Sequence, residues 1–202
     1  ESILRDAPCP VICSNMQAVL PDIQLPFVTS AILERRIPAH PNAPPVRIGL
    51  LSVLPEQTMR WDAHQLKGRV QVVNMVQAAR TTSAALRAEG CDVIIALAHT
   101  GVGHVADPDD SENALQRLAL IDDIDALIGG HTHLHLPDPA IPFSKPVVMP
   151  GSFGSHLGVI DLRLKHDHDG WALDGWDCGL RPISQRNDTG ELVPKVVEDA
   201  AL

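Results

Sequence analysis

Four apolar runs divide the chain and predict buried strands. They cover residues 46–54 (VRIGLLSVL), 92–101 (DVIIALAHTG), 125–130 (DALIGG) and 145–151 (KPVVMPG). The last run predicts a shorter strand. The runs are nearly continuous in apolar residues and lack the alternation of a strand that has one face in water. Strands of this type are usually buried on both faces, as in a parallel sheet covered by other elements.

Between these runs the apolar spacing changes to that of helices. A helical period starts at Val70 and ends before Gly90, a residue suited to a helix C-terminus. Residues 107–120 (DPDDSENALQRLAL) offer N-cap residues and predict a second, short helix. Residues 55–68 show no clear period and predict a loop. The predicted buried face of the first helix consists of Val72, Val76, Ala79, Ser83 and Leu86.

The two ends of the chain carry weaker signals. Residues 10–15 (PVICSN) predict a short buried strand, and residues 25–38 predict a longer strand or a hairpin arm. Residues 157–164 and 171–178 flank an Asp-Gly turn, which predicts a β-hairpin. Residues 186–202 are polar and irregular and predict a linker or tail.

Strand and helix alternate through the middle of the chain, which is the order of an α/β fold with a parallel sheet and crossover helices. In open sheets of this kind, ligands bind beyond the carboxyl ends of the strands. The residues that follow each predicted strand are therefore the first candidates for function.

Composition excludes several classes of function. The formal net charge of −9 and the absence of Tyr argue against binding a nucleic-acid polymer or stacking single-stranded bases. No apolar run approaches the roughly 20 residues that cross a bilayer, so no membrane span is predicted. The first ten residues lack the features of an export signal and resemble the end of an amphipathic helix.

Histidines follow two neighbouring strands of the predicted sheet. His99 comes directly after the apolar run at 93–98, while His131 and His133 follow Gly129-Gly130. Residues two apart in an extended chain point to the same side, so we expect the last two rings to share a face. The glycine pair lets the backbone bend and approach a ligand. Three imidazoles would then converge on a metal centre.

The sequence gives weaker evidence for a functional role of the other histidines. His104 and His156 are candidates for contact with substrate or for supporting the metal ligands, whereas His135 is expected to be a polar loop residue. His166 and His168 repeat the His-x-His spacing within the predicted hairpin turn, where exposed polar residues are ordinary. We therefore expect that second pair to be solvated.

Imidazole with carboxylate suits Zn, Mn or Fe, and a pair of such ions hydrolyses phosphate esters. Three neutral imidazoles cannot balance two divalent cations, so the site also needs carboxylates. No Asp or Glu follows a predicted strand in a comparable position. Asp6 and Asp22 fall in loops, Asp125 precedes its strand, and Asp161 lies within one.

Three segments together resemble a known family. LAHTGVG, ALIGGHTH and VVMPGSFGSHLGVIDL are similar to the C-terminal half of the calcineurin-like metallophosphoesterase domain, in its 5′-nucleotidase and 2′,3′-cyclic-nucleotide 2′-phosphodiesterase group. PVICSNM resembles the Ser/Ala-Asn element of that group. VLPEQTMRWDAHQLKG, DDSENALQRLA and RPIS resemble the cyclic-nucleotide phosphodiesterase branch.

The resemblance implies part of a layered α/β sandwich flanked by helices, with residues 1–185 as the C-terminal portion of the domain and the N-terminal strands missing. It assigns His99 and His131 to one metal and His133 to the other, with Gly130 in the Gly-His-x-His motif. The Asp-x-His, Gly-Asp and Asn-His motifs are absent from this chain, as are the bridging Asp, the ligand Asn and the catalytic His. The catalytic residue is therefore unknown here.

By this resemblance the complete protein is a hydrolase of nucleotides with two divalent ions, Mn, Zn or Fe. It would act on 2′,3′-cyclic nucleotides and 3′-nucleotides in preference to 5′-nucleotides, in the periplasm or at the cell surface. The chain alone is expected to be inactive, to hold metal only partially, and to self-associate through its exposed sheet.

Two alternatives remain at this stage. A metal-dependent amide hydrolase built on a barrel also places His-x-His at a strand end, but there the motif typically follows the first strand. A binding module with one zinc ion, or with none, would need only the three histidines. The ratio of metal to protein separates such a module from a two-metal enzyme.

Overall fold

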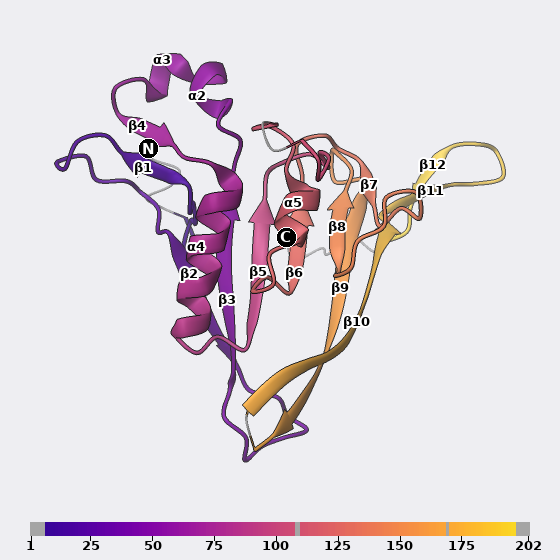
Figure 1. The fold of residues 1–202 in the computed structure, drawn as a ribbon. Helices are drawn as coiled ribbons and strands as arrows, with labels where there is room; N and C mark the ends of the chain where they lie inside the picture. Colours follow the sequence, from indigo (N-terminus) through magenta and orange to yellow (C-terminus); the bar gives the residue numbers. More distant parts are fainter. Residues whose placement is uncertain (1–6, 108–109, 169, 197–202) are drawn as a thin grey trace.

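The computed structural model describes residues 7–107, 110–168 and 170–196. The expectation of a helix end within the first ten residues falls largely on residues 1–6, outside this range. Figure 1 shows a central sheet with one long helix across its face and a long hairpin beside it. The main elements in chain order are β2 (Ser30–Arg35), β3 (Val46–Val53), α4 (Met75–Ala88), β5 (Val93–Ala98), α5 (Leu115–Ala119), β6 (Ala126–Gly129), β7 (His135–Leu136), β8 (Val147–Pro150), β9 (His156–Asp167) and β10 (Gly170–Pro182).

Six of these strands form the main sheet, in the order β2-β3-β5-β6-β8-β7. β3, β5, β6 and β8 are mutually parallel, and β2 and β7 run antiparallel at the two edges. This arrangement confirms the predicted α/β class and the four buried strands. The carboxyl ends of β5 and β6 lie side by side, because Ala98 pairs with Gly129.

The main sheet is covered by helices on one face, and its strands β3 and β5 are also covered on the other face. Ile94 and Leu127 face α4 and α5 and have no exposed surface, and Leu86 and Leu115 pack there too. On the opposite face, Val93 belongs to a second apolar cluster with residues of the β9–β10 hairpin. Alternate residues of β5 therefore pack into two different hydrophobic cores.

The predicted helix and hairpin are confirmed, but the helix begins later than its apolar period indicates. α4 starts at Met75 because the side chain of Asn74 accepts hydrogen bonds from the backbone N–H groups of Val76 and Gln77, both at 3.1 Å. Val72 instead belongs to a short strand that pairs with residues 16–18. The hairpin is longer than expected, with Gly170 paired with Asp167 beside its turn.

Short elements were misjudged at three places. The predicted loop at 55–68 contains two short helices, and the predicted strand at 10–15 is reduced to a single bridge between Ile12 and Val28. The predicted irregular tail begins with a small antiparallel pair. The short elements are β1 (Met16–Ala18), α2 (Thr58–Trp61), α3 (Ala63–Leu66), β4 (Val70–Val72), β11 (Ser184–Arg186) and β12 (Leu192–Pro194).

Asn15 joins three segments that are distant in sequence. Its side chain is fully buried; Nδ2 donates to the carbonyl oxygens of Leu54 at 2.8 Å and Val73 at 2.9 Å, and Oδ1 accepts from the Leu54 N–H at 3.1 Å. An amide is one of the few side chains that can donate and accept at once in this way. The Ser-Asn element of the sequence thus holds the chain after β3 to the segment before α4.

Asp125 lies at the amino end of β6, as its position before the predicted strand indicated, and the structure gives it a structural role there. Its Oδ2 accepts hydrogen bonds from Arg87 Nη2 at 2.5 Å and from the Ile94 N–H at 2.7 Å. The carboxylate therefore fastens the end of α4 to the starts of β5 and β6, at the edge opposite the histidines.

Candidate metal centre

His99 and His131 meet at the carboxyl ends of adjacent parallel strands. His99 directly follows β5, and His131 comes two residues after β6. Their ring centroids are 5.3 Å apart and the ring planes make an angle of 60°. The parallel register predicted this closeness, because it brings the residues after Ala98 and Gly129 to one edge of the sheet.

The two glycines before His131 have different roles. A Cβ at Gly129 would lie 2.9 Å from Leu115 Cδ2 and 3.0 Å from Met149 Cε, so packing against the core excludes a side chain there. Gly130 lies against the His99 ring, where a Cβ would be 3.6 Å from Nδ1, an ordinary contact distance. The pair thus brings the chain close to His99. Steric crowding requires glycine only at position 129.

The orientation of His131 and His133 does not come from strand alternation, and that part of the prediction is wrong. β6 ends at Gly129, and both histidines have left-handed backbone, with φ of 68° and 56°. Residues other than glycine rarely adopt this conformation, and those that do cluster at functional sites. A tight loop, not an extended strand, presents the two rings.

Glu112 supplies a carboxylate that the sequence analysis did not identify. Its Oε1 lies 2.7 Å from His131 Nε2, and the glutamate side chain is 38% exposed, so it is open to solvent on one side. An ionised carboxylate only accepts hydrogen bonds, so this contact requires a proton on Nε2 of His131. The expected lack of carboxylates at this edge is therefore corrected by one residue from the loop before α5.

Thr100 holds the loop that carries Glu112 through two hydrogen bonds. The hydroxyl of this fully buried threonine donates to the Glu112 carbonyl oxygen at 2.6 Å and accepts from the Ala114 N–H at 2.9 Å. A Cβ at Gly101 would lie 2.0 Å from Asn113 Oδ1, so the loop packs directly on that glycine. The residues just after His99 thus fix the carboxylate beside His131.

Asp110 holds the same loop from its other end. Its Oδ1 accepts hydrogen bonds from the N–H groups of Glu112 at 3.0 Å and Asn113 at 2.8 Å. Burial raises the pKa of this carboxyl, but the hydrogen bonds from Asn113 and Glu112 and the charge of Arg117 outweigh that effect, so the pKa lies below its ordinary value. The loop is therefore braced by an ionised group at neutral pH.

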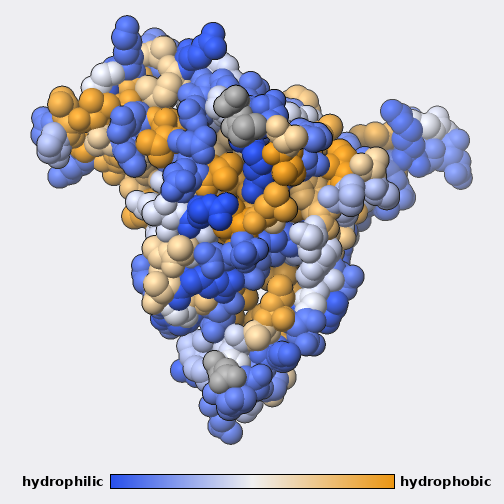
Figure 2. All heavy atoms as spheres, viewed as in Figure 1, coloured by the Kyte–Doolittle hydropathy of each residue, from blue (hydrophilic) through white to orange (hydrophobic). Residues whose placement is uncertain are grey.

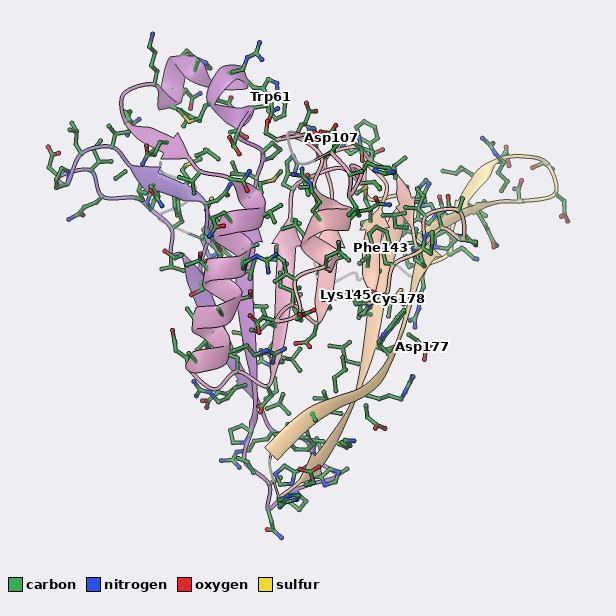
Figure 3. All side chains as sticks on the ribbon, viewed as in Figure 1. Trp61, Asp107, Phe143, Lys145, Asp177 and Cys178 are labelled. Atoms are coloured by element: carbon green, nitrogen blue, oxygen red, sulfur yellow. The ribbon has the colours of Figure 1, made fainter. Side chains whose placement is uncertain are left out.

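Trp61 of α2 covers another side of His131. The two ring centroids are 5.3 Å apart with an angle of 26° between the planes, which is a stacked arrangement. The indole remains 48% exposed, and Figure 3 places Trp61 beside α2, above the carboxyl ends of the central strands. The hydrophobic pattern did not mark Trp61, because the short helix that carries it has no apolar period, although its segment resembles the cyclic-nucleotide phosphodiesterase branch.

Burial lowers the pKa of His99, and the positive charges that His131 and His133 would carry lower it further. His99 is therefore neutral at physiological pH and keeps a lone pair available. His133 itself is exposed, and its place among the ligands stays a prediction.

The two accessory histidines have contacts of their own. His104 is exposed, and its Nδ1 accepts a hydrogen bond from the Ala106 N–H at 3.1 Å within its own loop. The His156 ring contacts that of His135, with 4.4 Å between centroids, and its Nδ1 lies 2.9 Å from Ser155 Oγ. A role for either in substrate contact stays a prediction. His166, expected to be solvated, contacts the ring of Trp171.

The donors at this edge are of the right kind for a divalent transition ion, since neutral imidazole and carboxylate are the usual ligands of Mn, Zn and Fe. Within the described residues, however, no three His, Cys, Asp or Glu side chains are already placed to hold one ion. The described residues thus bring His99, His131 and Glu112 together without forming a complete set of ligands for an ion.

Comparison with known proteins gives the family. The chain is 35% identical over 207 aligned residues to the trifunctional nucleotide phosphoesterase YfkN of Bacillus subtilis, covering 94% of this chain. It is 31% identical over 199 residues to the 2′,3′-cyclic-nucleotide 2′-phosphodiesterase/3′-nucleotidase of Salmonella typhimurium, covering 91% of this chain. The crystal structure of calcineurin-like phosphoesterase YfkN matches with a TM-score of 0.78 at 34% identity. The chain belongs to the calcineurin-like phosphoesterases.

The matches also define how much of such a protein this chain represents. It spans 14% of the length of the Bacillus protein, 30% of the Salmonella protein and 56% of the YfkN crystal structure. A 5′-nucleotidase precursor from Thermus thermophilus shares the fold, with a TM-score of 0.61 at 18% identity. A scan against protein-family models gave no match. None of the helices in the described ranges is long and apolar enough to cross a bilayer.

Proposed function

We propose that the natural polypeptide containing this chain is a metal-dependent hydrolase of nucleotide phosphoesters, acting on 2′,3′-cyclic nucleotides and 3′-nucleotides. The observation that carries the proposal is the meeting of His99 and His131 at adjacent strand ends, with Glu112 bonded to the second ring. The printed names of the relatives, a trifunctional nucleotide phosphoesterase and cyclic-nucleotide phosphodiesterases, support this substrate class.

In this proposal His99, His131 and His133 hold two divalent ions, Mn, Zn or Fe, together with ligands outside this chain. Bound divalent ions lower the pKa of a water ligand and offset negative charge on the phosphoryl oxygens. Glu112 keeps His131 in the tautomer whose Nδ1 is free, and Trp61 limits the rotation of the same ring. His99 stays neutral because of its burial, so no proton must leave it before it binds a cation.

Hydrolysis of three nucleotides tests the proposal. We expect the natural polypeptide to cleave 2′,3′-cyclic AMP and 3′-AMP in the presence of Mn²⁺, to cleave 5′-AMP more slowly, and to lose turnover with EDTA. Preference for 5′-AMP would indicate a 5′-nucleotidase instead. Metal binding without turnover of any of the three would show a single-metal or binding role and overturn the proposed activity.

We also propose that the protein acts in the periplasm or at the cell surface. The Thermus structure that shares the fold is of a 5′-nucleotidase precursor, and precursors commonly carry an export signal that is later removed. Cell fractionation that finds the protein in the cytoplasm would contradict this location.

The chain by itself is proposed to self-associate through the face of the main sheet opposite α4 and α5. Ile128 in β6 is 39% exposed and Leu157 in β9 is 57% exposed, whereas Leu127, on the helix side of β6, is fully buried. Exposed aliphatic residues on a central strand favour association. Sedimentation velocity of this 202-residue chain should show dimers or larger species at micromolar concentration. A single monomeric boundary would be evidence against the contact.

A further inference from the structure

Gln57 connects the two segments that contact His131 from different sides. Its backbone carbonyl oxygen accepts a hydrogen bond from the Trp61 N–H at 3.0 Å, in the turn that carries the indole. Its side-chain Nε2 donates to Ser111 Oγ at 2.7 Å, and Ser111 directly precedes Glu112. Since Trp61 stacks on His131 and Glu112 bonds to its Nε2, one residue is attached to both neighbours of that imidazole.

Hydrophobic packing does not by itself fix the helix that carries Trp61. Neither α2 nor α3, which both lie wholly within the described range 7–107, has a buried residue. Figure 2 shows hydrophilic and hydrophobic atoms mixed over these two helices, at the top of the view. A helix of four residues is also too short to be stable through its own hydrogen bonds. The position of Trp61 therefore depends on polar contacts made at the start of α2.

Stability alone would not favour an amide at position 57. The Oε1 atom of Gln57 is buried and has no hydrogen-bond partner among the described residues. Burying an unpaired carbonyl oxygen costs free energy, and an apolar side chain of similar length would avoid that cost. Exchanging the two amide atoms would not help, because the unpaired atom would then be the nitrogen, with its two N–H donors. What the amide provides here, and an apolar side chain cannot, is the bond to Ser111.

We propose that Gln57 is a positioning residue of the metal centre, which sets the spacing between Trp61 and Glu112 and thereby orients the ring of His131. The inference rests on the proposed function and extends it to a residue that acts on His131 through its neighbours. A ligand held in its binding orientation before the ion arrives loses less freedom on binding. Breaking the bond between Gln57 and Ser111 should therefore weaken the binding of the ion.

Gln57→Met tests the attachment, because methionine matches glutamine in length but has neither the donor nor the unpaired oxygen. In the natural polypeptide we expect the affinity for Mn²⁺, measured by isothermal titration, to fall about fivefold, less than for Glu112→Gln because Gln57 acts through another residue. The midpoint of thermal unfolding should rise, or fall by no more than about 2 °C.

Gln71→Met is the matched control and should leave the affinity for Mn²⁺ unchanged. Gln71 lies at an exposed position on β4, and its Nε2 donates to Gln17 Oε1 at 3.1 Å. This bond spans 54 residues of the chain, as does the bond from Gln57 to Ser111. The two variants therefore remove the same kind of contact, but only one of these contacts leads to His131.

Ser111→Ala removes the other partner of the same hydrogen bond. It should lower the affinity for Mn²⁺ by a similar factor, and adding Gln57→Met should then lower it by less than about 1.5-fold, since both changes break one interaction. Wild-type affinity in Gln57→Met would overturn the proposal, and so would losses that multiply in the double variant. A fall in affinity together with a larger drop in the unfolding midpoint would show a general role in stability and also overturn it.

Turnover distinguishes this inference from the proposed function. At saturating Mn²⁺, kcat of Gln57→Met for 2′,3′-cyclic AMP should return to within about twofold of wild type, because the substitution weakens metal binding and leaves the chemical step intact. A kcat that stays low at saturating Mn²⁺ would contradict the positioning role. Weaker Mn²⁺ binding in both variants of a protein that hydrolyses no nucleotide would support the positioning of His131 and overturn the proposed function.

Discussion

Replacing His131 with alanine is expected to lower the affinity for Mn²⁺ by more than about a hundredfold, because groups that only support a metal ligand already contribute about 10–100-fold. His131 is at the centre of the cluster: its ring contacts those of His99 and Trp61 and its Nε2 bonds to Glu112. Loss of the ring would remove one ligand and leave the carboxylate without its partner. Isothermal titration of the natural polypeptide with Mn²⁺ measures the effect. Its turnover of 2′,3′-cyclic AMP should fall to background.

Glu112→Gln tests, in the same titration, whether Glu112 supports His131 or binds the metal itself. Glutamine can still meet the His131 N–H through its amide oxygen but carries no charge, so affinity should fall by only about tenfold. His166→Ala is the control, because His166 belongs to the other His-x-His pair and contacts Trp171 at the far end of β9. Equal Mn²⁺ affinity in the His131 and His166 variants would remove His131 from the metal site.

Asn15→Ala is expected to reduce the free energy of unfolding by about 3 kcal/mol, the largest effect on stability that we predict. The substitution removes two donors and one acceptor from a side chain with no exposed surface. It leaves the carbonyl oxygens of Leu54 and Val73 and the Leu54 N–H without these partners, and unsatisfied buried groups each cost about 1–3 kcal/mol.

Urea unfolding followed by circular dichroism measures this difference. Asn42→Ala, at an exposed position between β2 and β3, should change the free energy of unfolding by less than about 0.5 kcal/mol. A change below about 1 kcal/mol for Asn15→Ala would mean that water replaces the amide at all three contacts. The attachment of the chain after β3 to the segment before α4 would then not depend on this side chain.

The sequence by itself determined the central sheet and the strand-end histidines. Long apolar runs such as 93–98 can be satisfied only by burial on both faces, and parallel pairing then brings His99 and His131 to one edge. The start of α4 was misplaced because its apolar period continues into β4. There, Gln71 pairs with Gln17, a partner 54 residues away that no local pattern reveals.

Tertiary structure decided the remainder of the site. Glu112 comes to His131 through a loop held by Thr100 and packed on Gly101, and such contacts depend on how two loops fit together. Trp61 reaches the same ring from a four-residue helix, too short to show a period. Hydrophobic spacing is a local property of the chain and therefore specifies strands. The partners of a strand-end histidine come from distant segments, so only the folded chain selects them.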